Sequence, residues 1–530
     1  MENPGGTALP HTVARTLLDQ HADRLPDLSG LTVLVPNHRA GQDFARALAH
    51  EAGLTVLIPP RIAPLKSWAE NAASGRAEPQ ARRLARLHSV LRHEAWLGAA
   101  DKWALANELL QLADELSATR LGGAIGSRIR ALHAGTLDRE TALIEAVWQA
   151  LNTGGSDPQA RYARALDALL ARIESAPYPI YGYALGTLTA VEQQFLERCA
   201  ECAPLTLFEP EAEDSVALIL RQAWQLTEPP LRERAALLAE RIPDSPLLSR
   251  ITLSPAPHLE AEARAVATWV AAQLHAGKRD IALIALDRET ARRVRALLER
   301  MDVLVADETG WTLSTTAAAA VIDRWLECVA SDFPHVELLD LLKSPFVLGE
   351  LAARQDQVLA FELALRRHGI AQGMADMRRL AHAEFAALPP WLATLADARQ
   401  GFEQRRAPLA VWLARLTDSL ARLDAVAPLE ADAAGARVLE TLDTLRRDLA
   451  DDAEKYGFGE WRRWLNLALE SDSFIDTRVV SPVVLTSLPA ARGRLFDAVA
   501  VTGADARHLP ARPAPGLFSQ TTRAQLGLPT

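Results

Sequence analysis

The sequence is poor in cysteine and lacks any long apolar run. Its 530 residues include 3 cysteines, too few for the disulfide framework that stabilises many small secreted proteins. No apolar stretch reaches the roughly 18 residues of a membrane-spanning helix, and the first residues do not join a basic segment to an apolar one, as a signal peptide does. From these absences we expect a cytoplasmic protein with no membrane partner.

Lysine is also scarce, because arginine supplies almost all of the positive charge. Lysine occurs only at positions 66, 102, 278, 343 and 455. Alanine is abundant as well, and a GC-rich genome explains both features more simply than selection for phosphate-binding guanidinium groups does. The formal net charge of −10 does not favour a nucleic-acid-binding protein, although local basic clusters could still follow a DNA backbone.

Two groups of strand-like runs, each interrupted by a long helical stretch, predict an α/β protein of several domains. The first group covers residues 31–36, 54–58, 179–183 and 205–208, and the second covers residues 281–286, 303–305, 483–486 and 496–503. Short, β-branched apolar runs of this kind are typical of buried parallel strands. We therefore predict two parallel-sheet domains, each interrupted by an α-helical insertion. The first domain comprises residues 1–75 and 176–245 around insertion 76–175, and the second comprises residues 246–335 and 476–530 around insertion 336–475.

Local signals mark where two of the helices begin. Thr189 and Glu192 have the spacing of a capping box at the start of a helix. Asp287 follows a strand-like run and precedes a helical pattern, the usual position of an N-cap.

The sequence lacks the residues that an ATPase needs. Gly5, Gly6 and Thr7 are not followed by a lysine, so they do not complete the phosphate-binding pattern G-x-x-x-x-G-K-[ST]. The run around Tyr181 and Tyr183 carries no acid that could hold magnesium. We therefore expect no nucleotide site, no catalytic residue, no metal, no cofactor and no ATP hydrolysis.

A polar loop between two strand-like runs is the most informative stretch of the chain. The first run, Val483–Thr486, is followed by Pro489, Arg492 and Gly493, and the second run stops at Gly503. Loops that follow parallel strands lie at the edge of the sheet where ligands bind. This loop is therefore a candidate binding segment.

The order of residues in this stretch resembles motif V of superfamily-one DNA helicases of the UvrD and RecB type. In those helicases a strand ends in Thr-x-His and an Ala-Lys-Gly turn follows. Here Ser487 stands for the threonine, Pro489 for the histidine and Arg492 for the lysine, and Leu495 replaces an acidic residue. A retained scaffold with lost chemistry is typical of AddB-like and RecC-like subunits, the inactivated helicase halves of bacterial helicase–nuclease complexes.

Other segments resemble the same family. The stretch LVPNHRAGQDFARAL is similar to motif Ia, in which the loop between strand and helix touches single-stranded DNA, and Asn37, His38 and Arg39 occupy that loop. A surface loop that caps a helix is the alternative interpretation. The region from Glu260 to Ala318 is similar to the start of the second RecA-like domain of AddB proteins. The resemblance thus implies that both predicted parallel-sheet domains are RecA-like.

The resemblance implies a non-catalytic DNA-binding subunit of an AddAB- or RecBCD-type complex, acting in double-strand break repair and recombination. Its partners would be DNA ends, duplex or single-stranded, and an AddA/RecB-like helicase–nuclease subunit. The candidate DNA contacts are Asn37, His38, Arg39, Ser487 and Arg492. Two alternatives remain open: an architectural subunit that docks the motor without binding DNA, and the helicase-like N-terminal part of a longer PD-(D/E)XK exonuclease.

Two weaker patterns have ordinary explanations. Cys199 and Cys202 lie at the end of an expected helix with no second pair nearby, so we expect buried thiols rather than a metal site. Trp461 and Trp464 beside Arg462 would suit base stacking, but tryptophans turned toward a helical core are more common.

Overall fold

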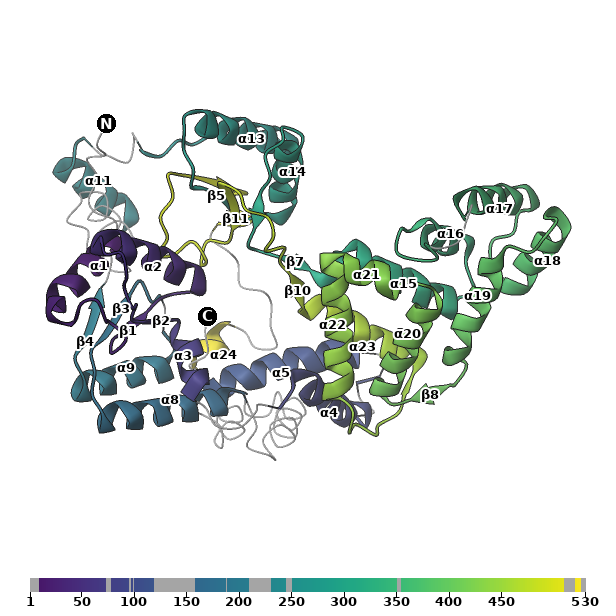
Figure 1. The fold of residues 1–530 in the computed structure, drawn as a ribbon, viewed down its shortest axis with the longest axis horizontal. Helices are drawn as coiled ribbons and strands as arrows, with labels where there is room; N and C mark the ends of the chain where they lie inside the picture. The colour runs from purple at the N-terminus through teal and green to yellow at the C-terminus, as the bar shows by residue number, and fades with distance from the viewer. Residues whose placement is uncertain are drawn as a thin grey trace.

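The computed structural model of the chain describes residues 9–72, 78–94, 97–98, 100–118, 158–186, 188–208, 230–244, 250–349, 354–509 and 520–525. Within these residues it contains two parallel sheets of four strands each, together with a large helical region. Figure 1 shows the first sheet at the left, the second sheet above the centre and the helical region at the right. The mixed α/β class with parallel sheets agrees with the sequence analysis.

The first sheet has the strand order β2-β1-β3-β4, and all of its pairings are parallel. Its strands are β1 (Thr32–Leu34), β2 (Arg61–Ala63), β3 (Ile180–Tyr183) and β4 (Leu205–Phe208). Strands β3 and β4 therefore return to the sheet that β1 begins, across more than a hundred residues of intervening chain. This return confirms the prediction that the run at residues 31–36 shares one sheet with the runs at 179–183 and 205–208.

The expected strand at residues 54–58 is wrong in position. Leu54, Val56 and Ile58 are exposed at the margin of the sheet, and Ile58 makes only an isolated bridge to Asp27. The regular strand β2 starts after the Pro59-Pro60 pair. The apolar pattern was misleading because these side chains are not buried against a helix layer, which is what the pattern of a buried strand requires.

Helices cover both faces of the first sheet. Val33 and Val35 pack with α1 (Leu9–Gln20) and α2 (His38–Ala52). Leu34 points to the opposite face and packs with α3 (Leu65–Ala72), α8 (Pro158–Ser175) and α9 (Ala190–Cys202). This division follows from the alternation of side chains along a strand. The predicted capping box at the start of α9 is present, since Thr189 and Glu192 bond to each other's backbone N–H.

The second sheet has the order β12-β5-β11-β6, again entirely parallel. Its strands are β5 (Ile281–Ala285), β6 (Ala306–Asp307), β11 (Val483–Thr486) and β12 (Ala498–Thr502). Helices α13 (Leu259–His275) and α14 (Arg288–Glu299) pack on one face, and the Asp287 side chain caps α14 as predicted. The strand expected at residues 303–305 is displaced to β6, because the Val303 N–H instead bonds to Leu298 O at the end of α14.

The helical region is built from segments of both predicted insertions. Helices α4 (Gln80–Arg92) and α5 (Lys102–Ala118) share one hydrophobic core with the helices that follow β7. Trp103 of α5 donates a hydrogen bond from Nε1 to Glu460 O across this core, at 3.0 Å. In Figure 1, α5 extends from the first sheet toward the helices at the right. The two stretches that are separate in sequence therefore form a common packing unit.

The remaining α-helices and strands of the described chain lie outside the two parallel sheets and α4 and α5. The α-helices are α11 (Leu231–Arg241), α15 (Ala317–Ala330), α16 (His335–Lys343), α17 (Arg354–His368), α18 (Met374–Glu384), α19 (Pro390–Arg399), α20 (Leu409–Arg422), α21 (Val426–Ala431), α22 (Ala433–Asp448), α23 (Phe458–Ser471) and α24 (Gln520–Gln525). The antiparallel pairs are β7 (Trp311–Thr312) with β10 (Ser473–Phe474) and β8 (Arg406–Ala407) with β9 (Tyr456–Gly457). None of the helices in the described chain combines the length and apolarity needed to cross a bilayer.

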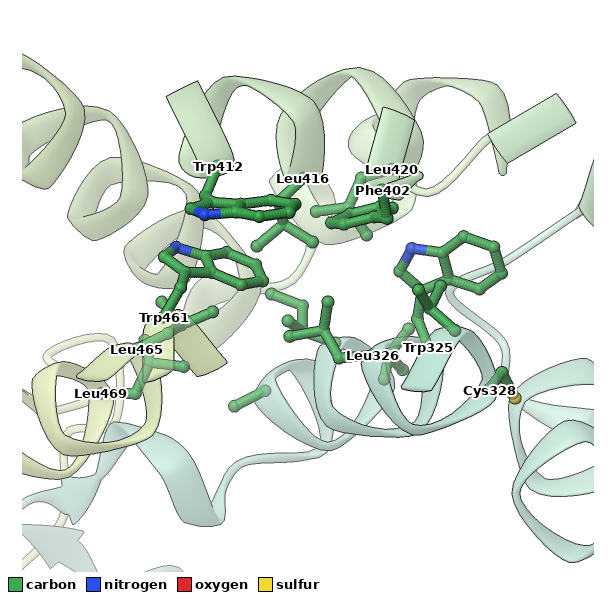
Figure 2. Close-up of a cluster of buried hydrophobic side chains, with 14 of the residues drawn as sticks. Trp325, Leu326, Cys328, Phe402, Trp412, Leu416, Leu420, Trp461, Leu465 and Leu469 are labelled. Carbon is green, nitrogen blue, oxygen red and sulfur yellow. The ribbon is translucent and has the colours of Figure 1, made fainter. Parts of the chain in front are cut away.

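Tryptophans fill the core of the helical region. Trp412 and Trp461 stack with ring centroids 5.6 Å apart, and Trp325 approaches from α15 (Figure 2). Trp461 and Trp464 are both completely buried. Their rings are therefore unavailable for base stacking, and the inward arrangement considered from the sequence is confirmed. Arg462, between them in sequence, pairs with two carboxylates of α15.

Candidate nucleic-acid interface at the junction of the two sheets

Loops at the carboxyl ends of strands from the two sheets touch each other. Asn37 follows β1, and its Nδ2 donates a hydrogen bond to Ala490 O, in the loop after β11, at 3.3 Å. Gly493 of the same loop packs close to Pro36 and Tyr183 of the first sheet. The sequence analysis selected both loops as candidate binding segments, and folding brings them together.

The polar groups of the first loop are used mainly inside the protein. Asn37 Oδ1 accepts from the Ala40 N–H at 2.8 Å and thereby caps α2. His38 Nε2 lies 3.2 Å from Ser67 Oγ. Asn37 thus has the capping role that the sequence analysis kept as the alternative, and it also joins the two loops.

A cluster of opposite charges joins the same segments. Arg494 bonds to Glu308, with Nη1–Oε2 at 2.5 Å and Nη2–Oε1 at 3.3 Å, and its Nε lies 3.4 Å from Asp43 Oδ2. Arg39 Nε is also 3.4 Å from Glu308 Oε1. The Arg494 side chain is only 8% exposed, and those of Glu308 and Asp43 are 12% and 13% exposed. We call Arg39, Asp43, Glu308 and Arg494 the junction charge cluster.

This cluster ties together segments from both sheets. Asp43 belongs to α2, which packs on the first sheet, and Glu308 directly follows β6 of the second sheet. The Glu308 N–H donates to Leu485 O of β11, which fixes its backbone. Arg494 therefore neutralises carboxylates from both sides of the junction, a role that the sequence analysis did not assign to it.

Arg492 has a different environment from Arg494. Its side chain is exposed, and among the described residues no carboxylate pairs with it. The guanidinium lies against Gly186, where an added Cβ would stand 2.5 Å from Arg492 Nη1. Ser487, the other candidate in this loop, accepts from the Ala490 N–H at 3.4 Å and shapes the turn. Of the two candidate arginines, Arg492 thus has no carboxylate partner among the described residues, whereas Arg39 lies 3.4 Å from Glu308.

A cavity of about 470 Å³ opens beside Arg492. Its walls are mostly apolar and come from the carboxyl ends of β3 and β4, the start of α1 and the loop after β11. The lining residues are Leu9, Pro10, Gly182, Ala184, Leu185, Gly186, Leu188, Leu207, Phe208 and Arg492, Gly493, Arg494, Leu495. Ala184, Gly186 and Gly493 have positive φ angles of 50°, 83° and 72°. Of these walls, the sequence analysis identified only the loop with Arg492 and Gly493 as a candidate binding segment, and it did not identify the residues after β3 and β4.

Two tyrosines, and no acidic residue, lie in β3. Tyr183 donates from its hydroxyl to Ala40 O at 3.0 Å, and burial raises its pKa above the usual value. Tyr181 donates to Gln20 Oε1 at 2.8 Å. Both hydroxyls are therefore structural groups that join β3 to the helices beside it.

The cysteine pair is not part of a ligand cluster in the described chain. Cys199 is fully buried, and desolvation raises the pKa of its thiol to about 12. Cys202 directs its Sγ toward Cys199 O at 3.5 Å. The described residues do contain one group with metal-ligand chemistry, His11, His50 and Glu51, which the sequence analysis did not identify.

No protein-family model matches the chain, and a search of curated proteins found no match. Functional inference therefore depends on the residues and the geometry of the chain itself.

Proposed function

We propose that this chain is a non-catalytic, helicase-like subunit that handles DNA ends beside a motor subunit of the AddA/RecB type, with two RecA-like domains. The observation that carries the proposal is the contact between Asn37 and Ala490, which lie 453 positions apart. The two segments resemble the helicase motifs Ia and V, and this hydrogen bond brings them into contact. The parallel sheets on either side of the contact are compatible with that arrangement.

The charge distribution suggests how DNA would be contacted. Arg492 is exposed and unpaired within the described chain, so its guanidinium can approach a phosphate at little desolvation cost. Arg39 is 46% exposed and only loosely paired with Glu308. Arg494 is buried by its carboxylate partners and serves the junction instead. We therefore assign phosphate contact to Arg492 first and to Arg39 second.

Salt-dependent binding to forked DNA tests this proposal. Fluorescence anisotropy would be measured from low to physiological salt on the chain alone and on its complex with an AddA/RecB-like motor. Because each neutralised phosphate adds about 0.9 to the slope of log K against log salt, R492A should lower that slope by about 1 and weaken binding severalfold. Arg463 is exposed on α23, and R463A, which removes the same charge there, is the matched control.

Two results would refute the proposal. Absence of DNA binding at low salt by both the chain and the complex would exclude a DNA-handling role. Equal effects of R492A and R463A would show that the junction is not the contact site.

An architectural subunit that docks the motor without touching DNA is the second candidate. Two observations favour it. Glu308 pairs with both Arg39 and Arg494 and offsets their positive charge, and the formal net charge of the chain is −10. In this case the R39A/R492A double variant would co-purify with the motor, and DNA binding by the complex would be unchanged.

A further inference from the structure

Three potential metal ligands converge where α1 packs against α2. His11 is in the first turn of α1, while His50 and Glu51 are in the last turn of α2. One ligand atom from each residue lies within 4.8 Å of those of the other two. The two imidazole rings are nearly perpendicular, with centroids 5.7 Å apart. Two nitrogens and one carboxylate oxygen form a ligand set that zinc commonly accepts.

The observed spacings suit a tetrahedral ion. Glu51 Oε1 lies 2.8 Å from His11 Nδ1 and 3.6 Å from His50 Nδ1. Ligands at zinc bond lengths of about 2.0–2.1 Å in tetrahedral geometry are separated by roughly 3.3 Å. To reach it, the first distance must lengthen by about 0.5 Å and the second must shorten by about 0.3 Å. The ligand atoms of the third pair, His11 and His50, lie within 4.8 Å of each other, so these two side chains must also move closer together. His50 can make its shift freely because its side chain is 78% exposed.

Arg15 holds the carboxylate in the required orientation. Its Nε donates to Glu51 Oε2 at 2.6 Å, whereas its Nη2 lies 3.3 Å from Oε1, the oxygen that faces both histidines. An ion on Oε1 would replace the longer of these bonds and keep the shorter one, an outer partner of the kind that orients ligands in metal sites.

The charges around the site set the expected affinity. His11 Nδ1 and Glu51 Oε1 lie 2.8 Å apart, within hydrogen-bond distance, so an ion must displace the proton between them. The positive charge of Arg15 opposes a second cation. We therefore expect a dissociation constant of about micromolar magnitude, weaker than that of structural zinc sites with four protein ligands.

From this geometry we infer that His11, His50 and Glu51 bind one Zn²⁺, with a fourth position open to water, and that the ion joins α1 to α2. The inference is independent of the proposed DNA-handling role, since none of its ligands belongs to the junction of the two sheets.

Zinc titration of tag-free protein tests the inference. Competition with a chromophoric chelator should give one Zn²⁺ per chain, and H50A should weaken binding at least tenfold. E51Q keeps the shape of the side chain but removes its charge, and it should weaken binding to a similar extent. His275 is exposed in the last turn of α13, and H275A is the matched control that should bind like the wild type.

Cobalt gives a second measurement that does not depend on affinity alone. Co²⁺ on this ligand set should produce the visible absorption of a tetrahedral site, and H50A should lose it. Circular dichroism of each variant checks folding, which H50A should retain because the replaced side chain is exposed. Failure of the wild type to bind stoichiometric zinc would overturn the inference. Equal binding by the wild type, H50A and E51Q, or equal weakening by H275A, would also overturn it.

Discussion

Replacement of Arg494 by methionine should loosen the junction between the two sheets. Methionine keeps the apolar part of the side chain but removes the charge shared by Glu308 and Asp43. Without the guanidinium group, the carboxylates of Glu308 and Asp43 stay largely buried, at 12% and 13% exposure, and lose the cation that they share. An unpaired charge in such surroundings is costly because water cannot solvate it fully.

The expected magnitude follows from the partners that remain. Removing one member of a buried pair costs about 3–5 kcal/mol. Here Glu308 keeps Arg39 at 3.4 Å, and Asp43 keeps Arg46 at 2.5 Å. Partial compensation lowers our estimate to about 2–3 kcal/mol of unfolding free energy. The control R46M removes a partner of Asp43 that is 74% exposed, and it should cost no more than about 0.5 kcal/mol.

Urea unfolding followed by fluorescence would measure the free energy of unfolding of both variants. A double-mutant cycle of R494M with E308Q would isolate the interaction energy between Arg494 and Glu308. We expect a coupling energy of about 1–2 kcal/mol. Limited proteolysis should also cut residues 487–497 faster in R494M, because their attachment to the first sheet is weakened. Equal destabilisation by R494M and R46M, or additivity of R494M and E308Q, would refute the reasoning.

Three further predictions concern other parts of the chain. Gly503 has φ +74°, and an added Cβ would stand 2.6 Å from Asp287 Cβ, whereas Gly277, at φ +87°, has open space around it. In urea unfolding, G503A should therefore lower the free energy of unfolding by about 2 kcal/mol more than G277A does. Equal losses would contradict the steric argument. Burial against Trp103 lowers the pKa of His88 to about 4, so the unfolded chain binds a proton below about pH 6.5 while the folded chain stays neutral. His88 should therefore lower the free energy of unfolding by about 3 kcal/mol as the pH falls from 6.5 to 4. In H88F the free energy of unfolding should depend less on pH. An unchanged dependence in H88F would exclude His88 as the cause. ATP with magnesium should give neither hydrolysis nor a thermal shift, with or without DNA, and saturable binding at millimolar ATP or below would contradict the loss of the nucleotide site.

Short-range features could be derived from the sequence because their causes lie within a few residues. The capping box of Thr189 and Glu192 depends on a spacing of three residues, and the Asp287 cap depends on the N–H groups of the next turn. The strands β11 and β12 were located for a similar reason, since a contiguous β-branched run and a terminal glycine are local properties. Residues 54–58 show the limit, because their apolar pattern does not reveal whether a helix covers them.

Only the tertiary structure decided the contacts between distant segments. The burial of Arg494 between Glu308 and Asp43, the shared core of α5 and α23, and the convergence of His11 with His50 and Glu51 have no local signature. In each case the partners lie on separate elements, and their distance depends on how whole helices and sheets pack. Composition and periodicity constrain each element separately, whereas the relative placement of elements arises from the sum of many weak packing contacts. For this reason the sequence indicated which loops to consider, and the fold determined that Arg492 stays exposed while Arg494 is buried.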